Sequence, residues 1–564
     1  MAVRFSPVGY ASNHNVPCPL PNGAAALLLA VAVALSLASG STGQCAESRD
    51  VPNIVVILVD DMGFSDIGCY GSEIPTPCVD RLAAGGLRFT QFYNTARCCP
   101  TRASVLTGLY SHQAGVGHMT EDRGAPGYRG RLNDRCVTIA EVLQGAGYFT
   151  AMTGKWHVGQ NFGVVPWQRG FQRVLNSPAG GYYYDEGPRA QLFLDGQLLA
   201  KDDPALPQGW YSTDLWTDYG IKFIGEAVAA KKPFFLYLAH NAPHFPLQAP
   251  QEDIAKFRGR YKAGWDKLRA ERHAKQIALG VVDKAWGISP LPPEVSAWDR
   301  LTPAQQDRFD HIMAIYAAVV AHMDASVGRL IDALRDRGVL DNTLVLFLSD
   351  NGANAESGPN GRLEGKVPGS AHSVVFEGQS WATLSNTPLR RYKHYNHEGG
   401  ISTPLIVHWP ARIKTPGELR QQPGHLIDIM ATCVDVAGAK YPAEFKGQPI
   451  QPMEGKSLLP ALENRPIERD ALYWEHEGNA AIRVGDWKLV RLGRRGPWEL
   501  YNLRTDRTEQ HDLAAAEPER ASQLAAKWEA WAERTHVKPY PKDGEKKNAK
   551  GVAAAKTGLG SAKE

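Results

Sequence analysis

The stretch Asn53-Ile54-Val55-Val56-Ile57-Leu58-Val59 and the pair Asp60-Asp61 that follows it decide the fold of this chain. A continuous apolar run rich in β-branched residues predicts a strand that is buried on both faces. Strands of this kind belong to parallel sheets that are covered by helices on both sides. The two aspartates end the strand, and they place carboxylates at the sheet edge where open α/β folds bind ligands.

Further segments repeat this pattern of buried strands that alternate with helices. The expected strands are 149–153, 233–238, 344–348 and 403–407, and the expected helices are 76–84, 138–146 and 305–337. This alternation predicts an α/β fold with a large mixed, mostly parallel sheet flanked by helices. Residues 251–300 are rich in Lys, Arg and Trp and lack clear periodicity, so we expect a surface excursion near the site.

The character of the sequence changes after about residue 460. Short strand patterns at 471–474, 480–484, 487–492 and 498–503 precede an amphipathic helix pattern at 518–535. They predict a small C-terminal antiparallel sheet with one helix. The expected domains are therefore a catalytic domain over 47–460 and an α+β subdomain over 461–540.

The last segment, 541–564, is rich in Lys, Ala and Gly and has no aromatic residue. This composition predicts a disordered, solvated tail. A basic arm for nucleic acid or another polyanion is the alternative. The whole chain carries 62 Lys and Arg against 59 Asp and Glu, a net charge of +3, which is too small to indicate nucleic-acid binding.

The N-terminus has the pattern of an export signal. Residues 24–37 are an apolar run, and Ala38-Ser39-Gly40 is a plausible cleavage site. The run is too short to span a bilayer, so it predicts a signal peptide rather than a membrane span. We expect residues 1–46 to be signal peptide and leader, and the protein to be exported to the periplasm or outside.

The eight cysteines are too sparse for a disulfide framework. Cys18 and Cys45 lie in or near the leader. Cys69 and Cys78 are one possible bridge, and two unpaired, half-buried thiols are the favoured alternative.

A second decisive stretch runs from Cys98 to Gly108 and fits the pattern C-x-P-x-R-x-x-x-L-T-G. It resembles the signature of the sulfatase family, most closely the arylsulfatase-like bacterial enzymes of the alkaline-phosphatase superfamily. The resemblance implies an alkaline-phosphatase-like fold. It also implies that Cys98 is converted to Cα-formylglycine (3-oxoalanine) by a formylglycine-generating enzyme. Thr101 stands where the family usually has Ser, and Leu109 stands where Arg often follows. We expect the maturation enzyme to recognise the C-x-P-x-R element despite these two differences.

The modification explains the expected chemistry. A sulfated thiol is hard to clear, whereas one hydroxyl of a hydrated aldehyde attacks sulfur and the other later expels sulfate. The predicted activity is hydrolysis of sulfate monoesters, either aryl sulfates or sulfated carbohydrates, to an alcohol and inorganic sulfate. Sulfate-ester substrate and the maturation enzyme are the expected partners.

Four residues with oxygen ligands follow predicted strands: Asp60, Asp61, Asp350 and Asn351. Oxygen-only ligands suit Ca²⁺, with Mg²⁺ as the alternative, and disfavour zinc. The resemblance implies that these residues hold the ion together with an oxygen of the modified Cys98.

The resemblance also assigns cations around the nucleophile. Arg102 closes the C-x-P-x-R element and supports the hydrated aldehyde. Lys155 and His157 lie in a Gly-Lys-Trp-His segment typical of the family. Lys155 is expected to bind sulfate, and His157 to take a proton from the second hydroxyl.

Two further residues are expected on the sulfate. His244 lies in an Ala-Pro-His segment, and Lys393 precedes Glu398-Gly399-Gly400 by five residues, as in the family. Both are expected to bind sulfate oxygens. Either could protonate the leaving alcohol, and we favour His244 because imidazole titrates nearer neutral pH.

Three other interpretations stay open at this point. A phosphodiesterase or phosphonate monoester hydrolase of the same superfamily would share nucleophile and metal. A non-catalytic binder of sulfated glycans would keep the fold without turnover, although the complete site argues against it. Zinc-phosphatase chemistry would need His-rich ligands. The aromatic residues Tyr182-Tyr183-Tyr184, Trp210, Trp265 and Trp286 either line a sugar-binding cleft or, more commonly, pack in the core.

Overall fold

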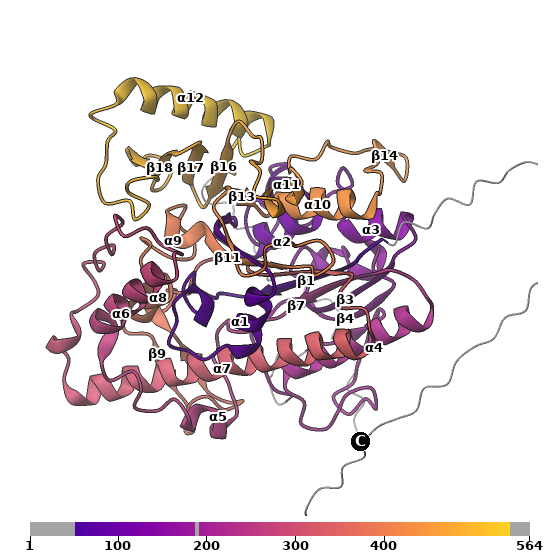
Figure 1. The fold of residues 1–564 in the computed structure, drawn as a ribbon, viewed down its shortest axis with the longest axis horizontal. Coiled ribbons are helices and arrows are strands. Elements are labelled where there is room, and N and C mark those ends of the chain that lie inside the picture. Colours follow the sequence, from indigo (N-terminus) through magenta and orange to yellow (C-terminus); the bar gives the residue numbers. More distant parts are fainter. Residues whose placement is uncertain (1–50, 186–190, 542–564) are drawn as a thin grey trace, which may run out of the picture. The chain divides into compact units, whose positions relative to one another are not determined.

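The computed structural model describes residues 51–185 and 191–541 (Figure 1). The predicted signal peptide and leader, with Cys18 and Cys45, lie outside the described residues. All but the first residue of the predicted tail, 541–564, lies outside them as well.

A large mixed sheet forms the centre of the fold, with the strand order β12-β2-β11-β8-β1-β7-β3-β4-β5-β6 and β13 paired to β2. Its strands are β1 Asn53–Val59, β2 Leu87–Tyr93, β3 Phe149–Lys155, β4 Arg173–Ser177, β5 Phe193–Leu194, β6 Gln197–Leu198, β7 Phe234–Ala239, β8 Thr343–Ser349, β11 Ser402–His408, β12 Leu419–Arg420 and β13 Gly424–His425. β1 lies in the interior, parallel to β7 and β8. The predicted mostly parallel α/β sheet is confirmed.

β1 is buried on both faces, as its sequence predicts. Val55, Ile57 and Val59 pack into one hydrophobic cluster with residues of α1, α4 and α7. Their neighbours Ile54, Val56 and Leu58 pack into a second cluster with residues of α2, α3 and α10. Because successive side chains of a strand point to opposite faces, the alternation shows that helices cover both sides of the sheet (Figure 1).

The helices alternate with these strands along most of the chain. They are α1 Pro77–Ala84, α2 Cys98–Thr107, α3 Ile139–Gly145, α4 Ser212–Ala229, α5 Gln251–Ala255, α6 Gly264–Ala278, α7 Pro303–Asp336, α8 Gly378–Ser385, α9 Glu398–Ile401, α10 Ile427–Ala437, α11 Leu459–Leu462 and α12 Pro518–Arg534, with 3₁₀ turns at Gly68–Tyr70, Gln160–Phe162, Pro166–Gln168 and Trp298–Arg300. α7 starts at a capping box in which Thr302 and Gln305 bond each other's backbone N–H.

α7 is long and apolar enough to cross a membrane by length and composition. However, 78% of its most apolar window is buried inside the protein. Packing against α4, α1 and the sheet therefore explains its apolar character.

β11 runs antiparallel to β8 and β2. A parallel strand would require the chain to cross to the end of the sheet where β8 begins. Between β8 and β11 the chain does not make this crossing. Residues 350–401 therefore return to the edge where β8 ends, and Gly352 N–H donates to the Gly400 carbonyl at 3.1 Å. This connection, which includes a small hairpin of β9 Arg362–Glu364 and β10 Val374–Phe376, supplies much of the site described below.

The C-terminal part contains the predicted antiparallel sheet with one helix. Its strands β16 Leu472–His476, β17 Asn479–Val484, β18 Trp487–Arg491 and β19 Trp498–Asn502 pair in sequence order. α12 packs on it through Trp528 and Trp531, which are buried with Leu489 and Leu500. A separate two-stranded ribbon joins β14 Glu444–Phe445 to β15 Gln448–Pro449.

Most residues of 251–300 are exposed or partly exposed, as expected, but the segment is more regular than its sequence pattern indicates. The segment contains α5 and α6, and Trp265 of α6 is 1% exposed, in contact with Trp298 and Trp381. One of its basic residues, Arg272, is nonetheless buried and ion-paired with Asp66 at 2.8 Å. Trp265 is therefore a core residue rather than part of a sugar-binding cleft.

The possible Cys69–Cys78 bridge is absent. Both thiols are free and partly buried. The backbone N–H of Cys69 donates to Asp80 and that of Cys78 to Asp324, so each cysteine is held by its own carboxylate.

Candidate active site

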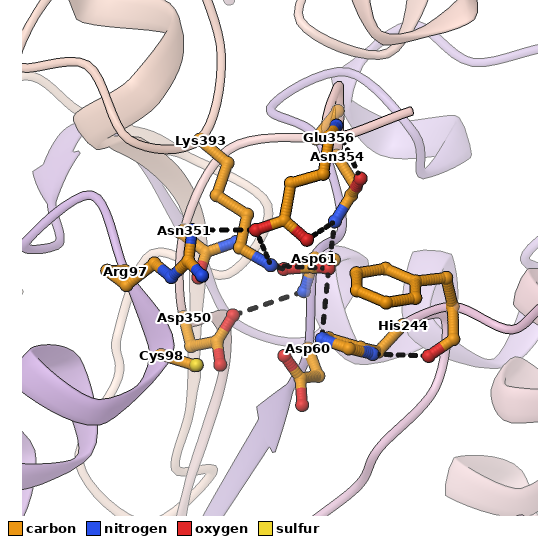
Figure 2. A network of polar contacts seen from close by, with 12 residues as sticks. Asp60, Asp61, Arg97, Cys98, His244, Asp350, Asn351, Asn354, Glu356 and Lys393 are labelled. Atoms are coloured by element: carbon orange, nitrogen blue, oxygen red, sulfur yellow. Dashed lines mark hydrogen bonds and ion pairs between the residues drawn. The ribbon is translucent and has the colours of Figure 1, made fainter. Parts of the chain in front are cut away.

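The carboxyl ends of β1 and β8 bring the predicted acidic residues together (Figure 2). Val59 pairs with Ser349 in parallel register, so Asp60-Asp61 and Asp350-Asn351 leave the sheet side by side. Asp61 has a left-handed backbone (φ 67°), and its N–H donates to Asp350 Oδ1 at 3.1 Å. These residues are all at most 1% exposed, so water does little to solvate their charges.

Two basic residues form ion pairs with the carboxylates of Asp60 and Asp350. Lys155, the last residue of β3, places Nζ 2.5 Å from Asp60 Oδ2. Arg102, on α2, lies 3.3 Å from the same oxygen and 3.1 Å from Asp350 Oδ2. Arg102 also donates to the Lys155 carbonyl at 3.0 Å, which ties α2 to β3.

Asp61 is the centre of a second set of contacts. Lys393 Nζ lies 2.9 Å from its carboxylate, and His244 Nε2 lies 3.5 Å from Oδ2. Asn351 donates to Oδ1 at 2.6 Å. Asn354 donates to Oδ2 at 2.8 Å. The connection between β8 and β11 thus supplies three of the four partners.

Two buried oxygens at the centre of this group have no hydrogen-bond partner. They are Oδ1 of Asp60 and Oδ1 of Asn351. Unsatisfied buried acceptors are costly, and a hard cation is bound by oxygens of this kind. Asp60, Asp61 and His244 also offer ligand atoms within 4.8 Å of one another. The donor set therefore fits a divalent cation.

The carboxylates differ in how well they are compensated. Burial and the Asp60 charge raise the pKa of Asp350 well above its usual value. Burial also opposes ionisation of Asp60, yet Lys155 and His244 bring its pKa below the usual value. Lys393 and His244 outweigh burial in the same way and lower the pKa of Asp61.

Cys98 is the first residue of α2, next to the partial positive charge of the helix N-terminus. It is 1% exposed, and its Sγ lies 3.5 Å from Nδ1 of His157. A hydrogen bond from the Cys99 thiol, with the charge of Lys155, holds the pKa of Cys98 well below its usual range. Burial lowers the pKa of His157, which favours the neutral ring.

Thr101 does not face this group. Its hydroxyl donates to the Asp350 carbonyl at 2.6 Å and lies 2.8 Å from the Thr95 hydroxyl. Thr101 therefore fastens α2 to the end of β8, and its oxygen is occupied by backbone.

Two cavities lie beside the group. One of about 250 Å³ is lined by His157, Gln160 and Tyr182 among others. Another of about 470 Å³ is lined by Tyr182, Phe245 and Arg362 among others. The Phe245 ring stacks on His244 at 4.2 Å, so the second cavity adjoins the predicted sulfate-binding histidine.

Sequence reasoning missed Arg97, Asn354 and Glu356. Glu356 Oε1 lies 2.6 Å from Arg97 and 3.6 Å from Lys393, and Asn354 contacts Asp61 directly. The available signal was their position: Asn354 and Glu356 follow Asp350-Asn351 within one short loop. All ten predicted site residues, in contrast, lie in the contacts described above.

Comparisons with known proteins agree on one family. The family model for Sulfatase matches residues 52–439, and the model for N-sulphoglucosamine sulphohydrolase, C-terminal, matches residues 391–533. An uncharacterized sulfatase of Schizosaccharomyces pombe is 36% identical over 88% of this chain and 96% of its own length. An arylsulfatase of Klebsiella aerogenes is 36% identical over 76% of this chain and 95% of its own length.

A solved structure shares the fold. The crystal structure of Ps i-CgsB in complex with k-i-k-neocarrahexaose is 28% identical and has a TM-score of 0.64. The similarity covers 86% of this chain and 93% of that one.

Proposed function

The chain belongs to the sulfatase family and hydrolyses sulfate esters, and on this premise we propose that it acts on aryl sulfates or sulfated carbohydrates with formylglycine at Cys98 and a bound divalent cation. The observation that carries the proposal is the place of Cys98. Cys98 is the first residue of α2, and its Sγ lies 3.5 Å from Nδ1 of His157. The neighbouring acidic group contains buried oxygens that have no hydrogen-bond partner.

The proposed cation is Ca²⁺, with Mg²⁺ as the alternative, held by Asp60, Asp61, Asp350 and Asn351 together with the modified Cys98. Two orphaned oxygens and the absence of sulfur among the other ligands support this choice. When bound, such an ion polarises a sulfate oxygen and orients the nucleophile.

The charge balance supports an anionic substrate. Three buried carboxylates face three buried cations, Lys155, Lys393 and Arg102. The protein charges alone therefore nearly cancel, and a divalent cation would make the site positive. A positive, water-excluded site attracts a sulfate ester more strongly than it attracts a neutral alcohol, which favours release of that product.

We assign the following roles to side chains around the nucleophile. In its formylglycine form Cys98 supplies a hydrated aldehyde that can attack sulfur and later expel sulfate. His157 takes a proton from that side chain, and its Nδ1 faces Cys98. Arg102 stabilises the hydrated form electrostatically.

Lys155, Lys393 and His244 are proposed to bind the sulfate oxygens. Lys393 and His244 both contact Asp61, a proposed ligand of the cation, and this closeness to the cation supports the role. We assign protonation of the leaving alcohol to His244, because an imidazole exchanges protons near neutral pH. The predicted leader implies export to the periplasm or outside, and the C-x-P-x-R motif implies maturation by a formylglycine-generating enzyme before folding.

Mass spectrometry of the tryptic peptide Cys98–Arg102 tests the nucleophile. Protein from its native source should show a loss of about 18 Da relative to the thiol, the change expected for conversion to the aldehyde. Cys98→Ala should abolish sulfate-ester turnover while leaving the melting temperature close to that of the wild type. Unmodified Cys98 in fully active protein would refute the assignment.

Chelation tests the cation. Removal of divalent ions should abolish turnover, and Ca²⁺ should restore it. Asn351→Ala should raise the Ca²⁺ concentration needed for restoration, whereas the surface variant Asp332→Asn should not. Full activity of metal-free protein would contradict the site. A phosphonate monoester should be assayed in parallel with the sulfate ester. If the protein is instead a phosphonate monoester hydrolase, kcat/KM should be higher on the phosphonate than on the sulfate ester.

A further inference from the structure

A second group of potential metal ligands lies near the catalytic site but shares no residue with it. It consists of His394, His476 and Glu477, whose ligand atoms all lie within 4.8 Å of one another. His394 follows the predicted sulfate-binding Lys393 on the connection between β8 and β11. His476 ends β16, and Glu477 begins the turn that leads to β17.

The distances are those of a compact nitrogen and oxygen site. Glu477 Oε2 lies 2.8 Å from His394 Nδ1, and Glu477 Oε1 lies 3.7 Å from His476 Nε2. His118 also approaches this carboxylate, with Nε2 3.2 Å from Oε1. Ligand atoms around one zinc ion, each about 2.0–2.2 Å from it, are separated by distances of this order.

His476 is the observation that distinguishes a metal site from an ordinary ion-pair cluster. Its side chain is completely buried, and neither ring nitrogen has a hydrogen-bond partner. It lies between His118 and His394, with ring centroids 5.5 Å and 6.0 Å away. A buried imidazole without a partner costs free energy, and a metal ion would satisfy one of its nitrogens.

The His394 ring is already oriented by a carboxylate on its second nitrogen. Its Nε2 lies 2.8 Å from Glu356 Oε1, so Nδ1 is left to face Glu477. A carboxylate behind the second nitrogen is the usual way in which proteins orient a metal-binding histidine. Glu356 also pairs with Arg97 (Figure 2). A guanidinium nitrogen of Arg97 lies 2.8 Å from His394 Nδ1, so Arg97 would have to move away from this nitrogen when an ion binds.

We propose that His394, His476 and Glu477 bind a divalent transition metal of the zinc type, with a fourth position left for water or His118. Two imidazoles and one carboxylate are a common zinc ligand set. This donor set differs from the all-oxygen set at Asp60 and Asp350, so the two sites would select different ions. Glu477 and His394 retain 34% and 25% side-chain exposure, which gives an ion access from solvent.

The site would join two parts of the protein. It links the turn between β16 and β17 of the C-terminal sheet to the segment that carries Lys393. Asn479 already donates to the His394 carbonyl at 2.9 Å across the same junction. Metal binding would therefore stabilise the folded protein against unfolding by mass action.

Zinc binding to the full chain in excess Ca²⁺ tests this inference, with Cys98→Ala as the background. This background is needed because Cys98, Cys99 and His157 form another potential metal group. We expect one zinc ion per chain by isothermal titration and by elemental analysis after gel filtration, and a zinc-dependent rise in melting temperature. His476→Gln and Glu477→Gln should each abolish both signals, and Glu356→Gln should weaken binding about 10- to 100-fold.

His240→Gln is the matched control. His240 is also fully buried with both ring nitrogens unpartnered, but it belongs to none of the potential metal groups found among residues 51–185 and 191–541. The His240→Gln variant should bind zinc as the background protein does. If His476→Gln fails to fold, the partly exposed Glu477→Gln decides. Absence of zinc binding in the background protein, or undiminished binding in Glu477→Gln, would overturn the proposal. These readouts need no turnover, so they are independent of the proposed activity.

Discussion

Thr101 shows how one side chain can act on the site without touching the reacting atoms. It stands where the family usually has serine, and its hydroxyl joins α2 to the backbone of Asp350 and to Thr95. A serine could make the same two contacts. The position therefore requires a hydroxyl rather than a particular side-chain volume, since both partners are buried.

We expect Thr101→Val to lower the free energy of unfolding by about 1–3 kcal/mol, because it leaves buried polar partners unsatisfied. Thr101→Ser should stay close to the wild type. Urea denaturation of the three proteins measures the difference. A loss in the serine variant with little loss in the valine variant would mean that the methyl group, not the hydroxyl, matters at this position.

Lys393 is buried and paired with Asp61 and Glu356. Lys393→Ala should reduce kcat/KM for a sulfate ester by about 10²–10³-fold, the range observed when one preorganised electrostatic contact is removed. It should also weaken inhibition by inorganic sulfate. Lys256→Ala, at a surface lysine paired with Asp253, is the control and should leave both values unchanged. Normal sulfate inhibition in Lys393→Ala would exclude a contact with the sulfate.

At the scale of elements, the site depends on where segments begin and end. β1, β3 and β8 each deliver a charged residue at the same sheet edge because they are parallel. The connection of residues 350–401 then returns over that edge instead of crossing the sheet. It carries Asn351, Asn354 and Lys393 toward Asp61.

Gly352 marks a close backbone approach within that connection. A Cβ at this position would lie 2.0 Å from the Gly399 carbonyl oxygen, so the backbone would have to move. We expect Gly352→Ala to impair kcat/KM more than about 10-fold, because small displacements of positioning groups are costly in catalysis. Gly145→Ala, where nothing lies within 4 Å, is the control. Unimpaired turnover in Gly352→Ala would show that the connection tolerates displacement.

At the scale of the whole molecule, Glu398 connects the C-terminal sheet to the catalytic part. Its carboxylate lies 2.9 Å from Lys488 Nζ on β18 and 2.9 Å from Arg507 Nε. Tyr93, at the end of β2, donates to it at 2.9 Å. All four side chains are buried, so this charge network replaces water at the junction.

Glu398→Gln should destabilise the protein by about 3–5 kcal/mol, because it leaves two buried cations short of a partner. The exposed pair of Asp332 and Arg335 gives a control, since Asp332→Asn should cost no more than about 1 kcal/mol. Thermal or denaturant unfolding measures both. A loss in Glu398→Gln as small as that of the control would contradict the role of Glu398.

Lowering the pH should reduce the difference in unfolding free energy between the wild type and Glu398→Gln. Burial opposes ionisation of Glu398, but Lys488 and Arg507 hold its pKa at about 2, below the usual 4.5. A lowered folded-state pKa stabilises the protein above the unfolded-state pKa, and this contribution is lost as the pH falls toward the folded-state pKa. The gap in unfolding free energy should be constant near neutral pH and shrink as the pH falls from 4.5 toward 2.

The sequence alone determined the fold class and the predicted participants of the site. A fully apolar strand must be buried on both faces, and residues that follow parallel strands must share one edge. The sulfatase resemblance selected ten positions, and all of them occur in the contacts of the site. The fold prediction is confirmed because it depends on local patterns, and the roles of the site residues stay predictions.

Tertiary structure alone decided which charges are paired and which polar atoms are left without partners. Arg272 looks like a surface residue in sequence but is buried against Asp66, and His476 looks like an ordinary strand residue but is buried without a hydrogen bond. Glu356 meets Arg97 from a position 259 residues away along the chain. Such pairings depend on contacts between distant segments, and local sequence patterns do not encode them.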